Sequence, residues 1–276
     1  MRRDDSILRE TRWASWVVVA VLVPAVVALW GFPGHTDDLW AWTIKAPLSA
    51  IFMGAGYCAG AYFFTRAALG SGWHTISAGV LSAAFFAAVM VVVTVIHWDK
   101  FNHGDAPFGA AFAFYGWVIV YFAAPFVVFA LWLRNQRTDP RQPEPGDPLV
   151  PQAVRRVAQA VSAVLGATAL ALLLWPSIGV EDGPWMHTPL TTRALAAYTA
   201  QVAFGALLIS LDRRWSSWRL LLQAFLVATA LLLVGVIREW GELETGRPSA
   251  WIFLGGLAAL GLAILLLYRT MESRLR

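Results

Sequence analysis

The sequence has few charged side chains and almost no cysteine. Asp, Glu, Lys and Arg together make up 14% of its 276 residues, whereas 58% are hydrophobic. Soluble domains average about 25% charged residues, and so small a polar fraction cannot cover a surface exposed to water. The single cysteine, Cys58, allows neither an internal disulfide nor a cysteine metal cluster. These shortages exclude a soluble globular domain, a disordered chain and a disulfide-rich secreted scaffold.

Ionisable side chains are also missing from eight long stretches of the chain. Each is long enough to cross the hydrocarbon layer of a bilayer, which takes about 17–25 residues. Backbone polar groups must be satisfied internally in lipid, and none of the stretches alternates in polarity like a barrel strand. The fold class is therefore predicted to be all-α, a polytopic membrane protein with eight transmembrane helices. The stretches are 13–32, 46–65, 75–96, 106–133, 157–180, 194–211, 220–237 and 248–268.

The basic residues predict the orientation. With the N-terminus in the cytoplasm and the spans alternating, every Lys and Arg falls on the inner side except Lys45, Lys100, Arg193, Arg238 and Arg247. Cytoplasmic loops of membrane proteins carry the excess of basic residues. Both termini are therefore predicted to be cytoplasmic. The basic residues responsible for the net charge of +4 therefore concentrate on the predicted cytoplasmic side. This distribution indicates that the partner is membrane lipid rather than nucleic acid.

A proline-rich segment divides the chain into two similar parts. Prolines stand at positions 140, 143, 145, 148 and 151, which favours an extended cytoplasmic linker. We predict a first four-helix unit at 1–134, the linker at 135–156 and a second unit at 157–276. Trp73 and Trp215 recur before the third and seventh spans at an offset of 142. Because each unit has an even number of spans, the two are predicted to be parallel four-helix repeats.

Short motifs in the first half carry a resemblance. They are Trp42, 47–50 (Pro-Leu-Ser-Ala), 54–57 (Gly-Ala-Gly-Tyr) and 96–101 (Ile-His-Trp-Asp-Lys-Phe). The chain resembles multi-pass membrane proteins of high-GC Gram-positive bacteria that have no known activity. The resemblance implies the bacterial inner (cytoplasmic) membrane as the location and implies no activity.

Cationic groups gather at the predicted outer ends of the helices. Lys45, His187 and Arg193 lie near the starts of the second and sixth spans, and His97 and Arg238 near the ends of the third and seventh. A cation at a helix N-terminus costs about 0.3–1 kcal/mol unless an anion joins it. These five residues are therefore predicted to bind a small anionic solute or a lipid headgroup. The alternative is that they reach the interface and pair with neighbouring carboxylates.

Catalytic and metal-binding motifs are missing from the sequence. It contains neither His-Glu-x-x-His nor Gly-x-Ser-x-Gly. We therefore predict no catalytic residue, no metal and no cofactor. The predicted function is binding or transport of a small anionic or amphiphilic solute at the outer face. One alternative is a non-catalytic accessory subunit with a membrane-protein partner, and the other is a lipid-active enzyme of the outer leaflet.

Small residues mark two of the predicted spans. Gly54 and Gly56 lie in the second, and Gly255 and Gly256 in the eighth. Because small faces let helices approach closely in lipid, they predict tight packing within the chain. Contact with another subunit is the alternative.

Overall fold

The computed structural model describes residues 4–104 and 106–275, and within them the chain is helical without a β-strand. Eight helices are long and apolar enough to cross a membrane, which confirms the predicted fold class. They are α1 (Arg9–Val26), continued by the π-helix η1 (Val27–Gly31), α3 (Pro47–Leu69), α4 (His74–Ile96), α5 (Phe108–Asn135), α6 (Gln152–Leu174), α8 (Pro189–Leu211), α9 (Trp215–Arg238) and α10 (Pro248–Glu272). The short helices are η2 (Pro33–His35), α2 (Thr36–Leu39), η3 (Trp98–Lys100), α7 (Ser177–Asp182), η4 (Trp240–Glu242) and η5 (Ser273–Leu275).

The fifth predicted span is displaced in the structure. The charge-free stretch 157–180 predicts a helix that continues to residue 180, whereas α6 ends at Leu174. Pro176 disfavours a helical conformation of the residue before it, and Trp175 indeed leaves the helical region. The remaining residues form the separate helix α7, so the predicted end of this span is wrong.

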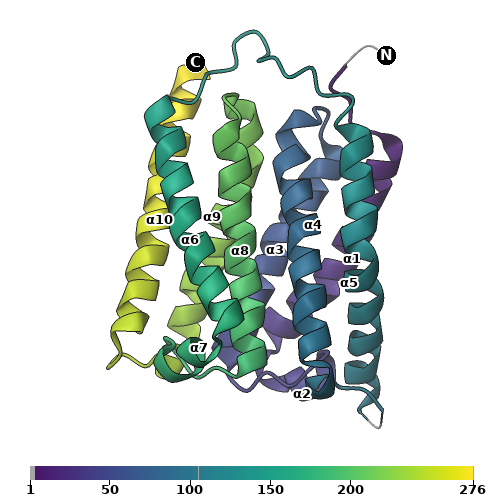
Figure 1. Cartoon of the computed structure of the whole chain (residues 1–276), viewed down its shortest axis with the longest axis vertical. Helices are drawn as coiled ribbons and strands as arrows, with labels where there is room; N and C mark the ends of the chain where they lie inside the picture. The colour runs from purple at the N-terminus through teal and green to yellow at the C-terminus, as the bar shows by residue number, and fades with distance from the viewer. Residues whose placement is uncertain (1–3, 105, 276) are drawn as a thin grey trace.

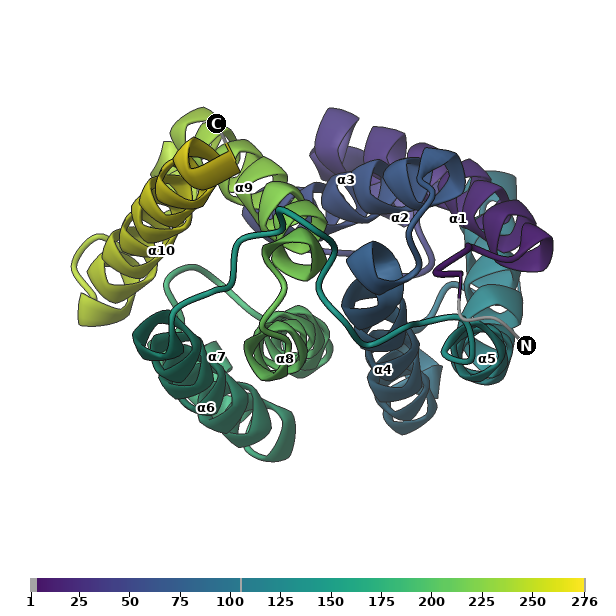
Figure 2. The same cartoon turned by 90° about the horizontal axis from the view of Figure 1, so that it is seen from above.

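The helices stand roughly side by side, with α1–α5 on one side of the molecule and α6–α10 on the other (Figures 1 and 2). Within the halves, α1 packs against α3 and α5 against α4, while α6 packs against α8 and α10 against α9. Between the halves, α3 packs against α9 and α4 against α8. Each of these helix pairs has a counterpart at the equivalent place in the other half, as the predicted repeat requires. The repeat itself stays a prediction.

The four helices α3, α4, α8 and α9 form the interior, whereas α1, α5, α6 and α10 bury few of their residues. Glycine permits close approach between the halves. A Cβ atom on Gly56 of α3 would lie 2.4 Å from the ring of Tyr198 of α8. By contrast, a Cβ on Gly255 or Gly256 of α10 would meet nothing within 4 Å. The predicted packing within the chain therefore applies to Gly54 and Gly56, whereas Gly255 and Gly256 have open space beside them.

The bundle has two distinct ends (Figure 1). We call the end with the segment 136–151 and the chain termini the linker end, and the end with α2 and α7 the hairpin end. Buried aromatic residues concentrate toward the hairpin end, where Trp42 and Trp117 pack edge to face at 5.0 Å between ring centroids. Most of the buried charged side chains lie at the linker end. The linker end, with its buried charges, therefore contains the candidate site.

Candidate functional site

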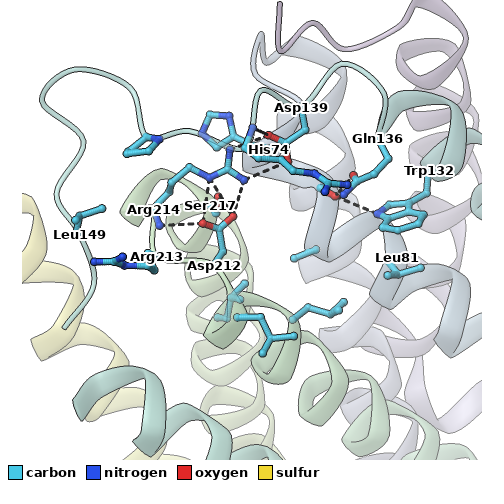
Figure 3. Close-up of a pocket in the computed structure, with 17 residues that line it drawn as sticks. His74, Leu81, Trp132, Gln136, Asp139, Leu149, Asp212, Arg213, Arg214 and Ser217 are labelled. Carbon is cyan, nitrogen blue, oxygen red and sulfur yellow. Dashed lines mark hydrogen bonds and ion pairs between the residues drawn. The ribbon is translucent and has the colours of Figure 1, made fainter. Parts of the chain in front are cut away.

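A cavity of about 550 Å³ lies at the linker end, between the two halves (Figure 3). The start of α4 and the end of α5 form one wall, and the end of α8 and the start of α9 form the other. Linker residues complete the lining. We call this space the Arg214 cavity.

Arg214 lies against two carboxylates in this cavity. Its Nη1 donates to Asp139 Oδ1 at 2.8 Å, and its Nη2 donates to Asp212 Oδ2 at 2.7 Å. Burial alone would raise the pKa of both carboxyls, but the hydrogen bonds and charge of Arg214 outweigh it and lower the pKa of each. Burial opposes the charge of Arg214 as well, and the two carboxylates nevertheless raise its pKa. All three groups therefore stay ionised at neutral pH and tie the linker to the corner between α8 and α9.

Two further arginines, Arg141 and Arg213, line the cavity and are exposed. Neither forms an ion pair with a carboxylate of the described residues. Arg141 has a φ of 58°, and its backbone N–H donates to Asp139 Oδ1 at 2.8 Å. Left-handed backbone is unfavourable for a residue with a Cβ atom, so this bond contributes to holding Arg141 at the cavity.

The opposite part of the lining is largely apolar. Leu81 comes from α4, and Leu208 and Ile209 come from α8. Trp132 of α5 also lines the cavity, and its Nε1 donates to Ser77 Oγ at 3.0 Å. The cavity thus combines unpaired guanidinium groups with an apolar wall.

A second network, which we call the His74 network, lies beside the cavity. His74 Nδ1 is 2.5 Å from Asp5 Oδ2, and His74 Nε2 is 2.8 Å from Ser216 Oγ. Ser216 Oγ donates to Asp147 Oδ2 at 2.6 Å. His74 begins α4 and also lines the cavity, whereas Ser216 belongs to α9 and Asp147 to the linker. The network therefore connects the N-terminal segment, both halves and the linker.

Asp5, His74 and Glu144 bring potential metal-ligating atoms within 4.8 Å of one another. Two donor atoms bound to one metal at about 2.0–2.2 Å normally lie about 3 Å or more apart. The 2.5 Å between His74 Nδ1 and Asp5 Oδ2 instead fits a shared hydrogen. We therefore interpret this contact as a hydrogen bond.

Among the predicted anion-binding residues, the structure brings His97 and Arg193 into contact. Arg193 Nη1 lies 2.9 Å from His97 Nε2, and its Nε donates to the carbonyl oxygen of Leu173 at 2.8 Å. Burial lowers the pKa of His97, and the charge of Arg193 lowers it further. The imidazole is therefore neutral at pH 7 and accepts a hydrogen bond from the guanidinium.

The other three predicted residues have separate surroundings. Arg238 donates to the carbonyl oxygen of Trp30 at 2.8 Å and pairs with Glu239 at 3.1 Å. Lys45 is exposed and forms no ion pair with the described residues. His187 lines a different pocket of about 200 Å³, and burial lowers its pKa to about 4. No described atom forms a hydrogen bond with its ring nitrogens.

The two helix starts named in the sequence prediction already have partners. At α3, the backbone N–H of Leu48 donates to Glu242 Oε2 at 2.7 Å, so an internal carboxylate lies at this N-terminus. At α8, Thr188 Oγ1 accepts from the N–H of Thr191 at 3.2 Å. Sequence reasoning found the type of interaction at α3 but assigned it to a ligand.

Sequence reasoning missed the His74 network, although the repeat contained a signal for it. His74 and Ser216 are 142 positions apart, the offset that also relates Trp73 to Trp215. Asp5 and Asp147 each accept a hydrogen bond from a backbone N–H located 69 positions later, in His74 and Ser216 respectively. Extending the Trp73 match by one residue would have paired His74 with Ser216.

No protein-family model matches the chain, and neither a curated protein nor a solved structure is significantly similar to it. The eight apolar helices define a multi-pass integral membrane protein. Any more specific function must come from the site itself.

Proposed function

We propose that this membrane protein binds, and moves across the bilayer, a small amphiphilic anion that enters the Arg214 cavity between the two halves. The observation that carries the proposal is the pairing of exposed arginines with an apolar wall in one space of about 550 Å³. Arg141 and Arg213 supply donors that match a phosphate or carboxylate. Leu81 and Leu208 supply the surface on which an alkyl chain packs.

The charges around the cavity support an anionic ligand. Arg214 is bonded to both Asp139 and Asp212, and that group of three carries a net charge of −1. Arg141 and Arg213 add two positive charges that no described carboxylate neutralises within ion-pair distance. The group of three and the two further arginines together carry a net charge of +1, which attracts an anion into the cavity.

The arrangement of the helices supports transport between two related halves. Under this proposal the halves are parallel repeats whose axis lies along the membrane normal. The protein lies in the bacterial inner membrane with both termini in the cytoplasm, so the cavity opens to the cytoplasm. The predicted outer-face residues, above all His97 and Arg193, stay the second candidate anion site. An accessory role in a larger complex and lipid chemistry at the outer leaflet are the remaining alternatives.

The binding experiment uses the full chain in lipid nanodiscs and dodecyl phosphate as the probe. Replacing one exposed charge contact removes about 1 kcal/mol, or about fivefold in affinity. We therefore expect Arg141→Gln and Arg213→Gln each to weaken binding about fivefold. Arg137→Gln is the matched control, because Arg137 is exposed at the same end but does not line the cavity.

The outcomes separate the alternatives. Weaker binding in both cavity variants and unchanged binding in the control support the proposal. Equal binding by all variants contradicts it, and loss of binding only in Arg193→Gln would place the anion at the hairpin end. Unchanged affinity for uncharged dodecyl maltoside in the cavity variants shows that the arginines recognise the phosphate.

A further inference from the structure

The positions of the hydrogens in the His74 network follow from its oxygen atoms. Ser216 has one hydroxyl hydrogen, and its Oγ lies 2.6 Å from Asp147 Oδ2. A carboxylate oxygen only accepts, so the hydroxyl hydrogen points to Asp147. Ser216 Oγ must then accept the bond from His74 at 2.8 Å. Nε2 of His74 therefore carries a hydrogen.

The second ring nitrogen of His74, Nδ1, also carries a hydrogen. His74 Nδ1 faces Asp5 Oδ2 at 2.5 Å, and Asp5 also accepts the backbone N–H of His74 at 3.0 Å. A nitrogen lone pair this close to a carboxylate oxygen would be strongly repelled, whereas an N–H donor gives a short charge-assisted bond. The network is thus built around an imidazolium, the ring with both nitrogens protonated.

We infer that His74 is a proton-binding site and that its proton joins the two halves and the linker to the N-terminal segment. Asp5 and Asp147 are the anions at its two sides, the second acting through Ser216. His74 and Asp5 are 4% and 8% exposed, so water does not replace these bonds while the network is closed.

The surrounding charges favour the bound proton. Asp5 faces His74 from the N-terminal segment, and Asp147 and Glu144 face it from the linker. From the α8–α9 corner comes Arg214, whose charge Asp139 and Asp212 offset. Gln136, which directly follows α5, is uncharged.

Loss of the proton has a defined structural consequence. A neutral ring has one N–H, so either Asp5 faces a lone pair or Ser216 must turn its hydroxyl hydrogen from Asp147 to the ring. The contact between α4 and the N-terminal segment, or that between α9 and the linker, then weakens. Because His74 also lines the Arg214 cavity, loss of its proton changes the cavity wall. This inference does not require a ligand in the cavity and stands if the proposed anion does not bind.

The first test observes the proton directly. The full chain in nanodiscs is labelled with ¹⁵N-histidine, and His74→Gln assigns the signal. At about pH 6 we expect two ring N–H protons on His74 that exchange slowly with water, because both are bonded and buried. His35 is exposed and supplies the matched control with fast exchange. A neutral His74 ring at this pH, or exchange as fast as in His35, overturns the inference.

The second test measures thermal unfolding between about pH 5.5 and 8.5. An imidazolium that gains partners in the folded state stabilises that state, and the contribution is lost when the proton leaves. We expect His74→Gln to lower the melting temperature at about pH 5.5 and the difference from the unmodified chain to shrink toward pH 8.5. His35→Gln should show no such trend.

Ser216→Ala keeps the fold testable if His74→Gln is poorly folded. It removes the acceptor of the Nε2–H bond together with the donor to Asp147, and should abolish the slow exchange of the Nε2 proton while the Nδ1 proton stays protected. Loss of protection at both nitrogens, or at neither, contradicts the hydrogen assignment. A pH-independent difference in melting temperature contradicts the proposed role of the proton.

Discussion

Replacing Arg214 tests the electrostatic part of the structure most severely. Its side chain is 9% exposed, and the side chains of Asp139 and Asp212 are 6% and 25% exposed. Removing one partner of a buried ion pair costs about 3–5 kcal/mol, because the remaining charge is left without compensation. We therefore expect Arg214→Met to lower the free energy of unfolding by about 3–5 kcal/mol at pH 7.

The loss of unfolding free energy in Arg214→Met should become smaller at low pH. Arg214 lowers the pKa of both carboxyls in the folded protein, so their contribution is present above the pKa of the unfolded chain and is lost as pH falls through the folded value. In Arg214→Met, the two carboxyls take up protons as the pH falls. The difference between the variant and the original chain should therefore shrink below about pH 4.

The assay is equilibrium unfolding in mixed micelles with increasing denaturing detergent. Arg213→Met is the matched control, since Arg213 is the exposed neighbour and should change stability by less than about 0.5 kcal/mol. Adding Asp139→Asn and Asp212→Asn to Arg214→Met should recover much of the loss. A cost below about 1 kcal/mol for Arg214→Met, or an equal deficit at pH 7 and at about pH 3, would refute the reasoning.

Two further predictions concern packing and orientation. Gly56→Ala should destabilise the protein by about 1–3 kcal/mol in the same assay, because the new Cβ would lie 2.4 Å from the ring of Tyr198. Gly255→Ala is the control and should be neutral, because its Cβ has open space. Equal effects of the two substitutions would contradict the packing. In a Cys58→Ala background, a membrane-impermeant maleimide should label Glu244→Cys at the hairpin end of intact cells but not Ser71→Cys at the linker end; the reverse pattern would invert the proposed topology.

The helices were predictable because lipid imposes a simple rule on the sequence. A long stretch without ionisable groups must satisfy its own backbone, and each such stretch corresponds to a helix. Helix ends were harder, because charged residues occur in the terminal turns. Arg155 lies inside α6 and its Nε donates to the carbonyl oxygen of Ser210 at 2.7 Å, so the helix starts before the charge-free stretch does.

The site was less predictable because its contacts join distant positions. His74 and Arg214 lie at the starts of α4 and α9, just outside the apolar stretches, where a charge is unremarkable in the sequence. The Arg214–Asp139 bond spans 75 positions. Helix-end reasoning identified the start of α3 as an anion site, yet only the fold brings Glu242 to Leu48, 194 positions away.

A density map of the protein in nanodiscs with dodecyl phosphate would test the proposed function most directly. The account predicts a phosphate-sized feature at Arg141 and Arg213, with the alkyl chain along Leu81 and Leu208. A cavity closed by protein side chains, or probe density only beside His97 and Arg193, would contradict it.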